Sequence, residues 1–269
     1  MKNVLVATKN VARFWDAARA LEARLRDPEH QGIGLIFGKP GVGKSMFMDA
    51  YYAQTRARGI VRVIKVRAQP IWTEASMLKY LLKALDQAPM AYRKDSMFDQ
   101  LAGELIRNPA VIIIDEIDAI AGSRRLISLL KDLHDMTGSS ILMIGEERVD
   151  QLLRRFESFY SRLNHSALAH VADHSLDDVA KVVAERCEYP VEPPVVEEIF
   201  RRRGKSLREV VDTIREIEAF CRSNEVKRFG PREFAAMTGV VRASGRVAAE
   251  QAKRGGLSVA AGAPAAEER

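Results

Sequence analysis

Cysteines and long apolar segments are scarce in this sequence. Only two cysteines occur among 269 residues, Cys187 and Cys221, and both fall within helical patterns. We therefore expect reduced thiols inside a core rather than a disulfide-stabilised scaffold. No apolar run approaches the ~20 residues that a membrane-spanning helix needs, and residues 1–8 become polar too quickly for a secretory signal peptide. The sequence thus predicts a protein that does not contact membranes.

Acidic residues are outnumbered by basic ones. The chain has 36 Asp and Glu against 42 Lys and Arg, a formal net charge of +6 and a sequence pI of about 9.4. This balance suits a polyanionic partner such as nucleic acid, although ordinary variation in composition explains it equally well. Hydrophobic residues make up 47% of the chain, which is enough for one sizeable core and a smaller packed unit.

A glycine-rich segment follows the first apolar run. Residues 38–45 read G-K-P-G-V-G-K-S, directly after the apolar residues 32–37. A strand followed by this loop is the context of a P-loop, in which main-chain N–H groups surround a polyphosphate where side chains are absent. Lys44 would neutralise the β- and γ-phosphates, and the Ser45 hydroxyl would bind Mg²⁺. The expected nucleotide contacts are Gly38, Pro40, Gly41, Val42, Gly43, Lys44, Ser45 and Met46.

A second motif ends a wholly apolar run. Residues 111–114 are aliphatic, as in a central parallel strand, and Asp115 and Glu116 follow directly. Asp115 would hold Mg²⁺ through water and also contact the nucleotide, while Glu116 would accept a proton from an attacking water. Two carboxylates at this point indicate hydrolysis of the nucleotide. Asp118 is better explained as a turn or capping residue.

Apolar runs alternate with helical patterns along most of the chain. Strands are predicted at 32–37, 60–66, 111–114, 140–144 and 167–171, and helices between them include 11–26, 44–57 and 149–163. This alternation predicts an α/β fold with a mostly parallel sheet flanked by helices. Four further helices are predicted to begin near Ser175, Pro193, Ser206 and Pro231.

The same patterns predict four parts of the chain. An N-terminal helical segment spans residues 1–31, a nucleotide-binding α/β unit spans 32–173, and a small helical unit spans 174–238. Residues 239–269 are rich in Ala, Gly and charged residues without a sustained apolar face, which predicts a flexible tail. The tail is interpreted as a solvated linker, with recruitment of a partner protein as the alternative.

The P-loop, the sequence V-I-I-I-D-E-I-D-A at 111–119 and the helical C-terminal part together resemble the AAA+ ATPases, over about Gly32 to Thr238. Compact size, basic charge and layout further resemble the DNA-transposition ATPases, the group of bacteriophage Mu transposition protein B, the TnsC-type regulators and the IstB-like helpers. The resemblance implies an AAA+ sheet with a C-terminal helical lid and ATP and Mg²⁺ as cofactors. It also implies the cytoplasm of a bacterium or phage-infected host.

The resemblance also implies roles for two arginines. Arg162 stands where the family has an arginine that reaches into a neighbouring subunit's nucleotide, with Arg154 and Arg155 as other candidates. Arg208 stands where the family has an arginine at the start of the third lid helix. One departure is Glu146, because the family usually has Asn, Thr or Ser after the fourth strand, so slow or partner-stimulated hydrolysis is expected.

Basic residues follow the second strand and the Asp-Glu motif, and in AAA+ assemblies these loops face a central channel. Cations there would bind DNA phosphates without regard to sequence. The predicted DNA-binding residues are Lys65, Arg67, Trp72, Lys79, Arg93, Lys94, Arg124 and Arg125. His165, His170 and His174 lack the cysteine or carboxylate neighbours of a metal site, so no histidine metal site is predicted.

The sequence therefore predicts an ATPase that forms a ring or helical filament of identical subunits on double-stranded DNA. Its predicted role is to select target sites for a transposase and to activate that transposase. One alternative is a helicase loader or replication-initiator-like ATPase. The other is a nucleotide-gated scaffold with little hydrolysis, for which Glu146 is the motivation.

Overall fold

The computed structural model describes residues 1–2, 4–25 and 32–239. Within these residues, five parallel strands form one sheet in the order β2–β3–β4–β1–β5. The strands are β1 (Ile33–Gly38), β2 (Arg62–Arg67), β3 (Ala110–Asp115), β4 (Ser140–Gly145) and β5 (Leu163–Val171). The predicted α/β fold with a parallel sheet is confirmed.

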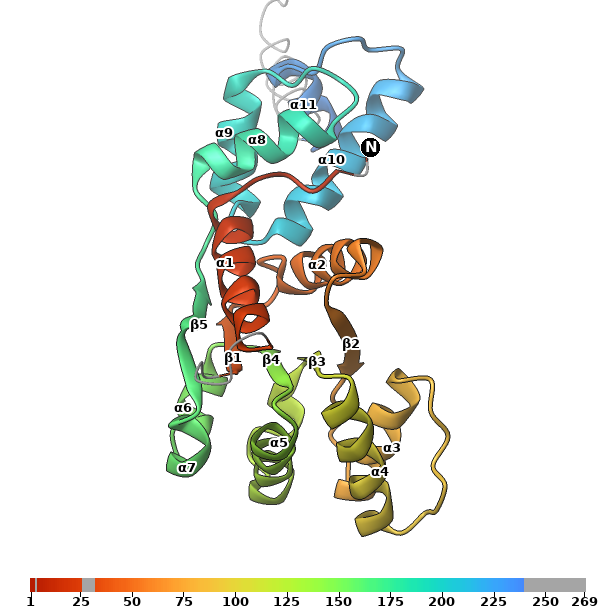
Figure 1. Cartoon of the computed structure of the whole chain (residues 1–269). Helices are drawn as coiled ribbons and strands as arrows, with labels where there is room; N and C mark the ends of the chain where they lie inside the picture. Colours follow the sequence, from red (N-terminus) through yellow and green to blue (C-terminus); the bar gives the residue numbers. More distant parts are fainter. Residues whose placement is uncertain (3, 26–31, 240–269) are drawn as a thin grey trace, which may run out of the picture.

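Helices cover both faces of this sheet (Figure 1). One face is covered by α1 (Lys9–Arg24) and α2 (Lys44–Arg58). The opposite face is covered by α3 (Glu74–Ala84), α4 (Lys94–Arg107) and α5 (Arg124–Thr137), joined by the short helices α6 (Arg148–Leu153) and α7 (Glu157–Tyr160). A 3₁₀ turn, η1 (Ile117–Ala119), follows β3. Thr73 and Ser123 cap the N-termini of α3 and α5.

Two clusters of buried side chains lie on the two faces of the sheet. Ile112 and Met143 pack towards α3, α4 and α5, whereas Val111 and Ile144 pack towards α1 and α2. This division follows from the alternation of side chains along a strand. Residues 111–114 are fully buried, so β3 is the doubly covered central strand that its aliphatic composition predicts.

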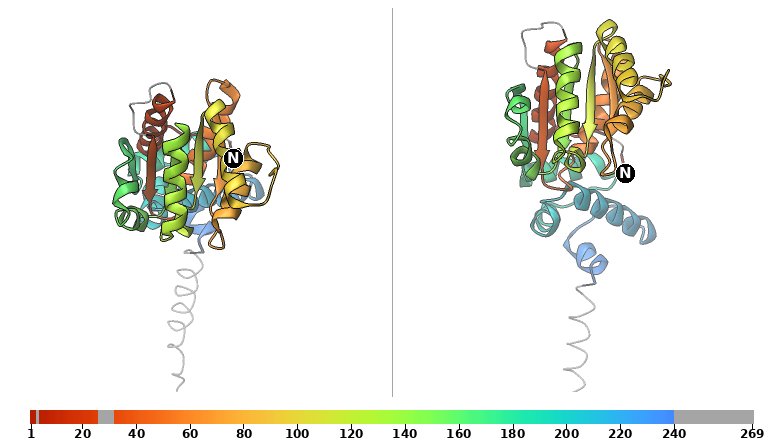
Figure 2. Two further views of the ribbon diagram at one scale, coloured as in Figure 1. Left: turned by 60° about the horizontal axis from the view of Figure 1, so that its bottom comes forward. Right: turned by 90° about the horizontal axis from the view of Figure 1, so that it is seen from below.

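Four C-terminal helices form a group that we call the lid. They are α8 (Leu176–Arg186), α9 (Pro193–Arg203), α10 (Leu207–Ser223) and α11 (Pro231–Met237). The lid lies beside α1 and α2 and extends beyond one end of the strands (Figure 2). Its residues Val210 and Ile214 belong to the same buried cluster as Phe14 and Phe47. Cys187 and Cys221 are free and buried in this cluster, as predicted.

The prediction of one helix over residues 149–163 was wrong. Phe156 has a non-helical backbone (φ −110°, ψ 73°) between α6 and α7, and Leu163 begins β5, where it pairs with Ile33 of β1. The apolar side chains of this segment have helical spacing, which is why the sequence predicts a helix. Pairing with β1 prevails because it buries Leu163 and also provides hydrogen-bond partners for its backbone. The end of α1 predicted at Arg26 and the tail beyond Gly239 lie outside the described residues.

No helix in residues 1–2, 4–25 and 32–239 is both long and apolar enough to cross a membrane.

Candidate functional site

The loop between β1 and α2 has the backbone that its glycines predict. Gly41 and Gly43 have φ of 80° and 100°, a region that L side chains rarely adopt. The Lys44 ammonium lies back over the loop and donates to the carbonyls of Gly38 at 2.7 Å and Lys39 at 2.8 Å. The loop therefore presents the start of α2, with its free N–H groups, to a cavity that can accept an anion.

The lid lies directly against this loop. A side chain at Gly41 would come within 2.5 Å of Ser206 Oγ, and one at Gly43 would come within 2.8 Å of Leu207 Cδ2. The Arg208 N–H donates to the Gly41 carbonyl at 3.2 Å. His174 Nε2 lies 3.0 Å from the Val42 carbonyl, so this nitrogen carries the proton that it donates. The glycines are thus required both by the backbone and by the approach of the lid.

Asp115 and Glu116 stand at the end of β3, beside the loop. Glu116 has a left-handed backbone (φ 53°), and its carboxylate forms an ion pair with Arg67, at the end of β2. Both partners are more than half exposed, so this pair holds Glu116 only weakly. No sequence motif predicts this pair, in which the expected general base bonds to an expected DNA-binding residue.

Burial changes the ionisation of two groups at the site. Burial lowers the pKa of the Lys44 ammonium, although the carboxylates of Asp118 and Glu146 oppose this change. Burial also raises the pKa of Asp115, against hydrogen bonds from the Glu116 N–H and the Ser45 hydroxyl. A cation beside Asp115 and an anion beside Lys44 would each favour the charged form of its neighbour, so both groups are suited to charged ligands.

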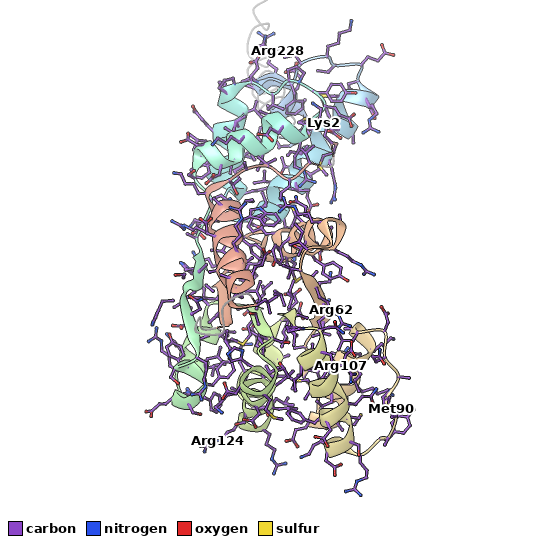
Figure 3. The ribbon with its side chains drawn as sticks, in the orientation of Figure 1. Lys2, Arg62, Met90, Arg107, Arg124 and Arg228 are labelled. Atoms are coloured by element: carbon purple, nitrogen blue, oxygen red, sulfur yellow. The ribbon has the colours of Figure 1, made fainter. Side chains whose placement is uncertain are left out.

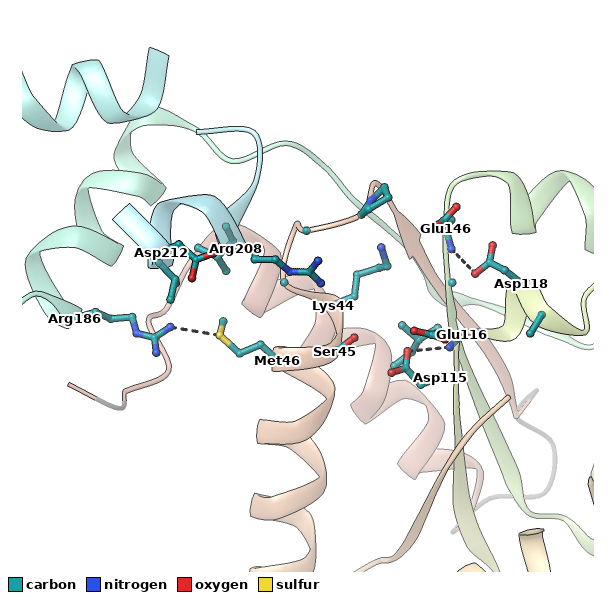
Figure 4. A pocket seen from close by; sticks show the side chains of 18 of the residues that line it. Lys44, Ser45, Met46, Asp115, Glu116, Asp118, Glu146, Arg186, Arg208 and Asp212 are labelled. Atoms are coloured by element: carbon teal, nitrogen blue, oxygen red, sulfur yellow. Dashed lines mark hydrogen bonds between the residues drawn. The ribbon is translucent and has the colours of Figure 1, made fainter. Parts of the chain in front are cut away.

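One cavity of about 670 Å³ joins these elements. Figure 4 shows Lys44 in its middle, Asp115, Glu116, Asp118 and Glu146 on one side, and Arg208, Asp212, Met46 and Arg186 on the other. The Glu146 N–H donates to Asp118 at 2.9 Å, so Asp118, within the turn η1, joins the segments that follow β3 and β4, and it also lines the cavity. The Glu146 side chain lines the cavity too, at the place where the family usually has an uncharged polar residue.

Comparisons with known proteins agree with this geometry. Residues 25–153 match the family model described as an AAA domain. The matched segment, 129 of the 269 residues, is therefore similar to an AAA domain. A search of curated protein sequences found no match to it.

Solved structures share the fold of the AAA domain and the lid. Orc1 of Aeropyrum pernix, solved in complex with DNA, superposes with a TM-score of 0.61 at 17% identity, covering 89% of this chain and 66% of the Orc1 chain. Cdc6p of Pyrobaculum aerophilum gives 0.66 at 13% identity, covering 89% and 70%. Domain III of the Thermotoga maritima replication initiation protein DnaA gives 0.54 at 15% identity, covering 87% and 97%. This chain thus spans just under two thirds of the length of Orc1.

The residues of the cavity fit the expected cofactors. Gly41 and Gly43 give the loop its left-handed turns, and Ser45 and Asp115 offer a hydroxyl and a carboxylate side by side. Among the described residues no group of three or more His, Cys, Asp or Glu side chains could hold a metal ion alone. Mg²⁺ commonly uses one or two protein oxygens together with phosphate oxygens, so this donor set fits Mg²⁺ bound with ATP.

Arg162 lies outside the cavity of its own chain. It follows α7 and forms two bonds to Asp135 of α5, at 3.1 and 3.2 Å, and a third to the Ser158 carbonyl at 3.0 Å. Its partners hold the guanidinium at the surface, where its side chain is 37% exposed. Burial raises the pKa of Asp135, but the hydrogen bonds from Arg162 and Lys131 lower it overall, so the pair with Arg162 is charged.

The predicted DNA-binding residues differ in how available they are. Trp72 is a correction, because it is 6% exposed and stacks on Tyr80, so little of its ring is available to a ligand. Local partners hold the other residues on α3, α4 and β2. Lys65 pairs with Asp49, Arg67 with Glu116, Arg93 with Asp95 and Lys94 with Glu74, and Lys79 lies over Tyr92.

Arg124 and Arg125 at the start of α5 differ from this group. Both are exposed, and no acidic side chain in the described ranges pairs with either. Arg124 points outward at the end of the molecule far from the lid (Figure 3). These two arginines are therefore the predicted DNA-binding residues most available to a phosphate.

Proposed function

We propose that this protein hydrolyses ATP with Mg²⁺ and that it does so as an oligomer on DNA. The observation that carries the proposal is the convergence of the P-loop, the Asp115-Glu116 pair and Arg208 on one cavity. Lys44 would neutralise phosphate charge, and Arg208 would reach the phosphates from the lid. Mg²⁺, held by Ser45 and Asp115, would supply further charge neutralisation. Glu116 would take the proton of the attacking water once it separates from Arg67.

The position of Arg162 supports assembly. A cation that stabilises charge on the γ-phosphate must reach it, and Arg162 does not line the cavity of its own chain. It would therefore act in a neighbouring subunit. The proposed assembly is a ring or a helical filament of identical chains.

Loss of Arg162 should reduce hydrolysis in a way that a second variant repairs. We expect Arg162→Ala to lower turnover about 10³-fold and to remove its rise with protein concentration. Mixing Arg162→Ala with Lys44→Met should restore turnover, because the first variant supplies an intact cavity and the second supplies Arg162. Lys131→Ala, which removes the other cation that pairs with Asp135, is the matched control. Equal turnover in Arg162→Ala and wild type, or no repair on mixing, would remove the proposed role in trans.

Binding to DNA is the second part of the proposal. We expect ATP to promote binding to duplex DNA of any sequence at low salt, with affinity that falls steeply as salt rises. The double variant Arg124→Ala, Arg125→Ala should weaken binding and reduce the slope of log K against log salt by about two. Arg107→Ala, which changes an exposed arginine paired with Glu104, is the control. A wild-type protein with ATP that fails to shift duplex DNA in gels at low salt would contradict this part.

Two cellular roles follow from such an ATPase. The resemblance in compact size, basic charge and layout supports a target selector and activator of a transposase. The structural similarity to Orc1, Cdc6p and DnaA domain III supports a replication-initiator-like or helicase-loading role as the second candidate. Stimulation of a transposase by the ATP-bound protein would favour the first role, and capture of a replicative helicase would favour the second.

A further inference from the structure

Arg186 is a buried cation at the cavity. It is the last residue of α8 and is 8% exposed, and it continues the buried stripe of Val179, Val182 and Val183. Its side chain nevertheless lines the cavity between the lid and the loop that joins β1 to α2. A charged residue in an apolar stripe is costly to bury without partners.

The protein supplies few partners for this guanidinium. Nε of Arg186 is buried without a hydrogen-bond partner, and Nη1 donates to Met46 Sδ at 3.6 Å, where sulfur is a weak acceptor. No carboxylate in the described part of the chain pairs with Arg186, whereas its neighbour Arg215 bonds to Asp212 at 2.8 Å. Burial and the charge of Arg215 both lower the pKa of Arg186. Since nearly all buried polar groups are hydrogen-bonded, a ligand acceptor is the missing partner.

The position of Arg186 identifies which end of the ligand it would meet. The carboxylates of Asp115 and Glu116 lie on one side of Lys44, and Arg186 lies on the other side, beyond Met46 (Figure 4). With the γ-phosphate at the carboxylates, the nucleoside would extend towards Arg186. Leu207 and Val211 line the same cavity and offer apolar surface to a flat ring.

We propose that Arg186 is a specificity-determining residue that donates hydrogen bonds to the base of a bound purine nucleoside triphosphate. The adenine ring presents nitrogen acceptors that an N–H of the guanidinium can reach. The inference rests on the proposed nucleotide site and adds the residue that would recognise the base of the bound nucleotide. Arg208, which lies nearer Lys44, would contact the phosphates, whereas Arg186 would contact the base.

Binding of ATP, ribose 5-triphosphate and inorganic tripolyphosphate, each with Mg²⁺, separates base, sugar and phosphate contributions. Wild type should bind ATP about tenfold or more tightly than ribose 5-triphosphate, as expected for hydrogen bonds from a charged donor. Arg186→Met should remove this preference while changing tripolyphosphate affinity by no more than about twofold. Arg186→Lys, which keeps the charge but lacks the buried Nε–H donor, should also lose most of the preference. Arg201→Met, on an exposed arginine of α9, should behave as wild type.

Three results would count against Arg186 as the base reader. Equal wild-type affinity for ATP and ribose 5-triphosphate would overturn it without any variant, while leaving the phosphate site intact. Equal losses for ATP and tripolyphosphate in Arg186→Met would show that Arg186 acts through charge or folding. An unchanged ATP preference in that variant would overturn it directly. By contrast, wild type that binds none of the three ligands would contradict the proposed nucleotide site itself.

Discussion

Replacing Lys44 with methionine should give a folded protein that MgATP no longer stabilises against heat. At a nucleotide concentration of 100 times Kd, binding to the folded state adds about 2.7 kcal/mol to the free energy of unfolding. For a domain of this size that corresponds to a rise in Tm of about 5–10 °C. Methionine keeps the apolar stem of Lys44 but removes the charge that faces the phosphates, so the rise should disappear.

Thermal melting with and without MgATP measures this effect. Lys39→Met is the matched control, because Lys39 lies in the same loop but is half exposed, pairs with Asp173 and does not line the cavity. The control should retain the full rise in Tm. If Lys44→Met retains it as well, the loop between β1 and α2 is not the phosphate site.

Replacing Glu116 with glutamine should separate hydrolysis from binding. The amide cannot accept a proton from water, so we expect kcat to fall about 100-fold or more. The shift in Tm with MgATP should remain, because Glu116 is not needed to hold the nucleotide. Glutamine also removes the ion pair with Arg67. A loss of activity would therefore not result from stronger binding of the residue 116 side chain to that arginine.

Steady-state release of phosphate measures kcat, with Glu147→Gln as the control. Glu147 is half exposed, faces His170 and does not line the cavity. Unchanged turnover in Glu116→Gln would favour a nucleotide-gated scaffold with little hydrolysis, the interpretation that Glu146 already suggests. If Glu116→Gln lowers turnover as expected and its complexes with DNA persist, the result would instead favour release of DNA by hydrolysis.

Local motifs made much of the fold and the phosphate-binding loop predictable. A P-loop between a strand and a helix and an aliphatic strand ending in Asp-Glu are recognisable within about ten residues of sequence. Contacts between distant segments were not predictable in the same way. The pair of Arg67 and Glu116 depends on β2 and β3 lying side by side, and the end of the helix at Phe156 depends on a free edge of β1.

Arg186 is an intermediate case. Its sequence position already places it seven residues after Val179, on the stripe that faces the core. A charged residue on such a stripe was therefore visible as an anomaly, although only the fold shows that it faces the cavity.

The shared buried cluster of α1, α2 and the lid also has a mechanical consequence. Val210 and Ile214 of the lid belong to the same buried cluster as Phe14 and Phe47, so the lid shares one core with α1 and α2. Closely packed helices move by sliding a short way past one another, as in shear motion, rather than by opening like a flap. We therefore expect a change of nucleotide state to displace α1 together with α10. The outer surface of α1 would then change position with the nucleotide state of the cavity, and a partner bound there would sense that change.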